Sequence, residues 1–258
     1  MSIQPVGLVS PVGRAAQWAR GLLLTTLVLT AASVVSGLFQ IDLLSHAASG
    51  GISDAAATAN DTRQVVIGGL QGIFYLATAV AFLNWIYRAY RNLTSLGVQD
   101  RKYSPGWAVG WFFVPVLSLV RPFQLMLELW HGSDPSGLER DAAPAGPSIQ
   151  SRPGTPPLVG WWWAVFLVSC VLGRIVLQMS LAQHPTLDQL QTLSVLLVLS
   201  DAVDVAAALL AIGVIGRITS WQAERAERVR QITDEHTLGP LAHSPLNIPT
   251  LVRRPEQS

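Results

Sequence analysis

Three ionisable residues stand within stretches that are otherwise apolar: Arg174, Asp201 and Asp204. The two aspartates are three residues apart, so their carboxylates lie on one face of a helix. A charge deep in a bilayer is costly and normally has a partner or contact with water. Because the apolar stretches that carry these residues are consecutive, we predict an intramembrane ion cluster in which Arg174 bridges to Asp201 and Asp204.

The sequence leaves two interpretations of this cluster open, as well as the possibility that Arg174 and the aspartates make no contact. A structural clamp would fix the register of two helices. An ion or proton relay would use the excess negative charge of two carboxylates against one arginine, which requires a proton or water. Polar residues elsewhere in the apolar stretches could support a relay: Gln40, Gln71, Tyr75, Thr78 and Gln178.

The sequence contains none of the usual motifs of catalysis or metal binding: HExxH, CxxC, P-loop, GxSxG or GxGxxG. Its single cysteine, Cys170, rules out a disulfide framework. We therefore expect no enzymatic activity, no catalytic residue, no metal and no cofactor. A net charge of +1 also argues against nucleic acid as a partner.

Composition indicates that lipid surrounds these charges. Of the 258 residues, 50% are hydrophobic and 13% are charged, and the mean hydropathy is +0.39. An ordinary soluble domain has roughly 25% charged residues. The chain is therefore expected to be a membrane protein.

Four stretches have the ~20 apolar residues that a membrane-spanning helix needs. Each must be helical, because lipid offers no hydrogen-bond partner to a free backbone group. The predicted spans are residues 21–44, 65–87, 158–181 and 190–215. The predicted fold class is an all-α membrane protein with four transmembrane helices.

A fifth apolar stretch, within residues 104–130, is interrupted by Pro115 and Pro122 and carries Arg121 and Glu128. Proline removes a helical donor and clashes with the preceding turn. We predict an interfacial or re-entrant segment, broken by proline. A fifth full crossing is the alternative, and it would place basic loops on opposite sides of the membrane.

Charge asymmetry favours four spans. In that topology every lysine and arginine except Arg63 and Arg174 lies on one side, as the positive-inside rule requires. We therefore expect a multi-pass protein of the cell inner membrane with both termini cytoplasmic.

Aromatic and basic residues gather around the broken segment and the end of the second span. We expect them to form an interfacial face for lipid or for a partner. Each basic residue near anionic headgroups contributes ~1 kcal/mol to membrane binding. A generic positive-inside loop with aromatic anchors is the alternative. The face comprises Arg88, Arg91, Trp107, Trp111, Arg121 and Trp130.

The remaining segments are predicted to be loops and tails. The membrane domain covers residues 14–232 and follows a flexible N-terminus, residues 1–13. Six prolines within residues 132–157 indicate a disordered cytoplasmic linker, and residues 233–258 are expected to form a disordered tail. A short external loop is expected over residues 45–62.

Residues 84–135 resemble the bacterial membrane-protein family catalogued as DUF4328, a domain of unknown function. With flanking spans of the same plan, the resemblance covers roughly residues 60–230. It implies a multi-span bacterial membrane protein and no established activity, and Ser118 departs from the expected asparagine. The resembling positions are Trp85, Arg88, Asn92-Leu93, Leu96-Gly97, Ser104-Pro105-Gly106-Trp107, Trp111-Phe112, Pro115, Arg121-Pro122, Glu128-Leu129-Trp130 and Ser133.

These patterns indicate a non-enzymatic membrane scaffold or lipid- or partner-interacting protein. The alternative is a small transporter or proton-linked channel that uses Arg174, Asp201 and Asp204. Expected partners are the bilayer and anionic lipid headgroups, and the sequence leaves a homo-oligomer or a membrane partner open.

Overall fold

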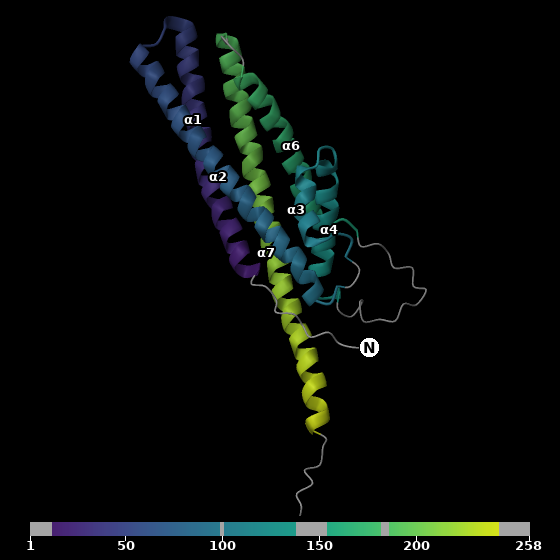
Figure 1. Ribbon diagram of the computed structural model, residues 1–258. Helices are drawn as coiled ribbons and strands as arrows, with labels where there is room; N and C mark the ends of the chain where they lie inside the picture. The colour runs from purple at the N-terminus through teal and green to yellow at the C-terminus, as the bar shows by residue number, and fades with distance from the viewer. Residues whose placement is uncertain (1–11, 99–100, 138–153, 182–185, 243–258) are drawn as a thin grey trace, which may run out of the picture.

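The computed structural model describes residues 12–98, 101–137, 154–181 and 186–242, with side-chain surroundings up to residue 233. Within these ranges the regular elements are all helical, and Figure 1 shows their arrangement. The elements are α1 (Val12–Gly50), α2 (Asp54–Ser95), α3 (Pro105–Gly110), η1 (Trp111–Phe113), η2 (Leu117–Leu119), α4 (Arg121–Ser133), α6 (Pro157–Ser180) and α7 (Leu187–Ala242).

Four of these helices, α1, α2, α6 and α7, are long and apolar enough to cross a membrane. This confirms the predicted all-α membrane fold. Helices α1, α2 and α7 each contain one predicted span and extend beyond it, whereas α6 matches its span to within one residue at each end. Helix α1, with 39 residues, is about 58 Å long at ~1.5 Å per residue, nearly twice the ~30 Å of hydrocarbon.

The expected loop over residues 45–62 is wrong, because only residues 51–53 separate α1 from α2. Ser53 caps α2: its hydroxyl accepts a hydrogen bond from the backbone N–H of Ala56, at 3.2 Å. Gly51 supplies the positive φ of 87° that the sharp turn requires. The alanine-rich sequence beyond this cap is a good helix former, so the helices continue outside the apolar spans.

Helix α7 also exceeds its expected length. It continues from Leu187 to Ala242, whereas the sequence predicts a disordered tail from residue 233. Residues 233–239 contain no proline, and extending an existing helix is far easier than nucleating one. Residues 1–11 and 243–258, and most of the predicted linker (138–153), lie outside the described residues.

The long helices pack in an open arrangement. Helix α1 packs against both α2 and α7, and α6 packs against α7. Helices α1 and α7 approach closely at Gly37, where an added Cβ would lie 2.7 Å from Cγ2 of Val198. Away from such contacts, large apolar side chains such as Val28, Ile73 and Leu76 are exposed, as expected where lipid covers the protein.

The segment between α2 and α6 forms a re-entrant hairpin, residues 105–133. Its two arms, α3–η1 and η2–α4, are bent by 110°. Ser104 caps α3 and Pro105 occupies the first turn, as the sequence suggests. At the tip, the N–H of Leu117 donates to the carbonyl of Pro115 at 2.7 Å, and Val116 between them has a φ of 64°. This is a γ-turn, a strained conformation for a β-branched residue.

The hairpin returns to the side from which it starts. Its entry and exit are joined by a hydrogen bond from the backbone N–H of Lys102 to Glu128, at 2.8 Å. Tyr103 also donates to the side chain of Gln124. Figure 1 shows α3 and α4 side by side along one half of the bundle. The expected re-entrant, proline-broken segment is confirmed, and α4 does not carry the chain to the opposite side.

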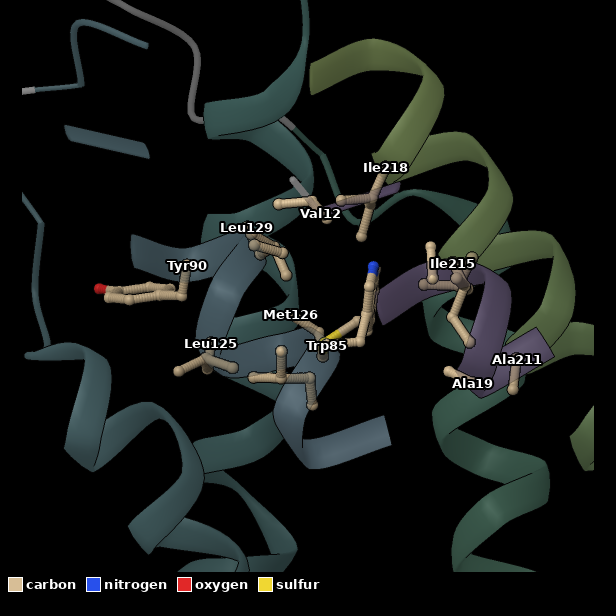
Figure 2. Packing of buried hydrophobic residues seen from close by; sticks show 14 of the residues in the cluster. Val12, Ala19, Trp85, Tyr90, Leu125, Met126, Leu129, Ala211, Ile215 and Ile218 are labelled. Carbon is tan, nitrogen blue, oxygen red and sulfur yellow. The ribbon is translucent and has the colours of Figure 1, made fainter. Parts of the chain in front are cut away.

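The hairpin packs onto one end of the bundle, here called the hairpin end: the last turns of α2, the first turns of α1 and α6, and α7 from residue 211 to residue 225. Trp85 lies at the centre of a buried cluster there, between Met126 and Leu129 of α4 and Ile215 and Ile218 of α7 (Figure 2). Each such apolar side chain contributes ~1.5–3 kcal/mol to folding stability when it is fully buried. The opposite end, where α1 meets α2 and α6 approaches α7, is called the loop end.

Candidate functional site

Asp201 of α7 lies inside the bundle. Its side chain is among the buried polar groups, at 8% exposed. It accepts hydrogen bonds from the amide of Gln71 on α2, at 3.4 Å, and from Ser33 on α1. Both of these partners are neutral.

Asp204 lies one turn further toward the hairpin end and is half-buried. The phenol of Tyr75 on α2 donates to its Oδ2 at 3.0 Å, and the hydroxyl of Ser169 on α6 donates to its Oδ1. Tyr75 in turn lies 3.4 Å from the hydroxyl of Thr30 on α1. A connected group of polar side chains from four helices therefore surrounds Asp204.

Arg174 does not join this group, contrary to the expected bridge. Its side chain is exposed, and in the part of the chain that the structure describes it makes no ion pair with Asp201 or Asp204. The prediction correctly placed the two aspartates on one face of α7. It failed for the arginine because the rotation of α6 turns that residue away from α7, while Ser169 faces Asp204.

A cavity of about 390 Å³ opens beside Asp204. Its walls come from α1, α2, η1, α6 and α7, and most of them are apolar. The polar part of its lining consists of Thr26, Thr30, Tyr75, Thr78, Ser169 and Asp204. The site is thus a lipophilic pocket with one acidic group at its wall.

The predicted interfacial face is divided into separate groups. Within the hairpin, the rings of Trp107 and Trp111 lie against each other, tilted by 33°, with centroids 4.7 Å apart. The guanidinium of Arg121 lies 5.5 Å from the centroid of Trp111 and donates to the phenol of Tyr103. Trp107 is 53% exposed, so this aromatic-basic group is accessible at the surface.

The other members of the face lie elsewhere at the hairpin end. Trp130 packs edge-on against Trp221 of α7, with ring centroids 4.8 Å apart, and Arg217 lies over Trp221. Arg88 donates to Asn84 on its own helix, and Arg91 is exposed. The structure therefore brings Trp107, Trp111 and Arg121 together and places Trp130, Arg88 and Arg91 apart from them.

An anchor of buried polar residues on α7 was not predicted from the sequence. Arg225 is 1% exposed and donates to the carbonyls of Leu96, at 2.9 Å, and of Asp134, at 3.0 Å. Gln222 is also buried and donates to Ala89. Their spacing of three residues was an available signal, but one arginine among several on α7 does not reveal by itself that it is buried.

These features define the class of protein: a multi-span, all-helical membrane protein with a re-entrant hairpin. The chain belongs to the family described as Domain of unknown function (DUF4328), which matches residues 48–220. The resemblance seen in the sequence is thereby confirmed. Comparisons with curated proteins and with solved structures give no match.

Proposed function

We propose that this protein is a non-enzymatic protein of a cell inner membrane that binds anionic lipid headgroups at its hairpin end, on the cytoplasmic side. The observation that carries the proposal is the re-entrant hairpin with its aromatic-basic group, Trp107, Trp111 and Arg121. Its tip is apolar and exposed at Phe113, Val116 and Leu119, which suits insertion among acyl chains. Arg121 begins α4 just after the tip, and its guanidinium turns back over Trp111 to Tyr103 at the entry of the hairpin, where it can meet headgroups.

The distribution of charge supports the cytoplasmic assignment. Among the described residues, the loop end carries Arg63, whereas the hairpin end and the helix segments beyond it carry most of the remaining basic side chains. This asymmetry is what the positive-inside rule expects of a cytoplasmic face. The basic residues concerned are Arg14, Arg20, Arg88, Arg91, Arg101, Lys102, Arg121, Arg217, Arg225, Arg228 and Arg230.

Thermal melting of the full chain in detergent, with added lipid, tests headgroup binding. We expect phosphatidylglycerol to raise the melting temperature more than phosphatidylcholine does, because a ligand that binds the folded state stabilises it. Arg121→Gln should reduce this difference. Arg228→Gln, which changes an exposed arginine on the extension of α7, should preserve it. Equal stabilisation by the two lipids would contradict the proposal.

Proton-linked transport is a second candidate, favoured by the hydrogen-bonded group around the aspartates. Gln71 bonds to Asp201, and one turn away Thr30 and Tyr75 bond in sequence to Asp204; these two neighbouring groups would relay protons without Arg174. Proton flux into proteoliposomes under an imposed gradient would support it if Asp204→Asn abolished the flux. Identical flux in protein-free and protein-containing vesicles would contradict it.

A further inference from the structure

We propose that the cavity beside Asp204 binds a lipophilic molecule that carries one protonated amine, with the amine against the Asp204 carboxylate. The cavity volume of about 390 Å³ falls in the range of ligand pockets, about 300–1,000 Å³. The inference is independent of headgroup binding, because Trp107, Trp111 and Arg121 do not line this cavity.

The cavity has an apolar end and a polar end. Phe82, Phe112 and Trp162 line it near the hairpin. Ser169 follows Trp162 by seven residues on α6, and Asp204 precedes Ala211 by seven on α7, which corresponds to about 10 Å along each helix. Ser169 and Asp204 therefore lie further from the hairpin end than Trp162 and Ala211 do. A ligand would therefore place its charged group deep in the bundle and its apolar body toward the hairpin.

The charge of the site selects a cation. No lysine, arginine or histidine is found among the described residues that line the cavity. Tyr75 and Ser169 each donate one hydrogen bond to Asp204, and a carboxylate can accept about four. An ammonium group would supply both a further donor and the missing positive charge. Hydrogen bonds between charged partners are roughly twice as strong as neutral ones.

Other lipophilic molecules fit this lining less well. A neutral alcohol or a lipid tail could fill the apolar end, but it would leave the acidic end without a counter-charge. A fatty acid would bring a second carboxylate close to Asp204, with Asp201 one turn away. Among molecules of the same chain length, we therefore expect an amine to bind more tightly than an alcohol, and an alcohol more tightly than a carboxylate.

Photolabelling of the full chain in phosphatidylcholine nanodiscs tests this ranking. The probe is a diazirine-bearing alkylamine, and mass spectrometry locates the labelled peptides. We expect labels on the cavity-lining turns of α2 and α6. Dodecylamine should reduce labelling at a concentration about tenfold lower than dodecanol requires. Dodecanoate should compete least. Equal competition by the three molecules, or labelling confined to surfaces outside the cavity, would overturn the proposal.

Two variants separate binding from folding. Asp204→Asn should weaken labelling about tenfold, whereas Asp42→Asn, which changes an exposed acid near the loop end, should leave it unchanged. Ala79→Phe fills the cavity from an exposed position and should abolish labelling, with the melting temperature retained. Undiminished labelling of a folded Ala79→Phe protein would overturn the proposal even if Asp204→Asn did not fold.

Discussion

Lys102, just before the first arm of the hairpin, and Glu128, on the second arm, are linked by a hydrogen bond of 2.8 Å between the backbone N–H of Lys102 and Oε1 of Glu128. The same carboxylate oxygen accepts from the phenol of Tyr90 on α2, at 3.1 Å. Tyr90 is fully buried, so the hairpin is fastened to the bundle at its base. A chain tied together in this way cannot place its two arms on opposite sides of a membrane.

Cysteine labelling in intact vesicles should report this topology. In a Cys170→Ser background, Lys102→Cys and Ser136→Cys should react with an impermeant thiol reagent from the same side, because they flank the hairpin. Ala48→Cys, at the loop end, should react from the other side. Reaction of Lys102→Cys and Ser136→Cys from opposite sides would show a fifth crossing and contradict the fold described above.

Arg225→Ala should destabilise the protein by about 2–4 kcal/mol, because it removes a buried donor and leaves two backbone carbonyls without this partner. The measurement is the free energy of unfolding in detergent. Arg228→Ala is the matched control on the same helix. Its ion pair with Glu224 is about half exposed, so its loss should cost less than about 0.5 kcal/mol. Similar losses in both variants would contradict the buried anchor.

Gly37→Ala should lower the free energy of unfolding by about 1–3 kcal/mol, because the added methyl group would overlap Val198. Valine is β-branched and moves little, so α1 and α7 must separate. Gly69→Ala on α2 is the control, since a Cβ there meets nothing within 4 Å. A Gly37→Ala protein that melts like the Gly69→Ala protein would show that α1 and α7 do not pack this closely.

Local sequence was sufficient to predict the spans and the break between them. Crossing lipid requires about 20 apolar residues in a helix, and this condition can be read from one stretch at a time. Pro115 and Pro122 likewise act on their own neighbourhood, so a broken segment was predictable. The turn at residues 51–53 was missed because alanine-rich helices extend beyond the apolar spans.

Tertiary structure alone decided which side chains meet. Spacing placed Asp201 and Asp204 together on α7, but the rotation of α6 gave Asp204 a serine in place of Arg174. It also decided that Arg225 is buried while Arg228 on the same helix is exposed. The rotation of a membrane helix depends on its packing against neighbouring helices, and hydropathy along the chain carries little of that information.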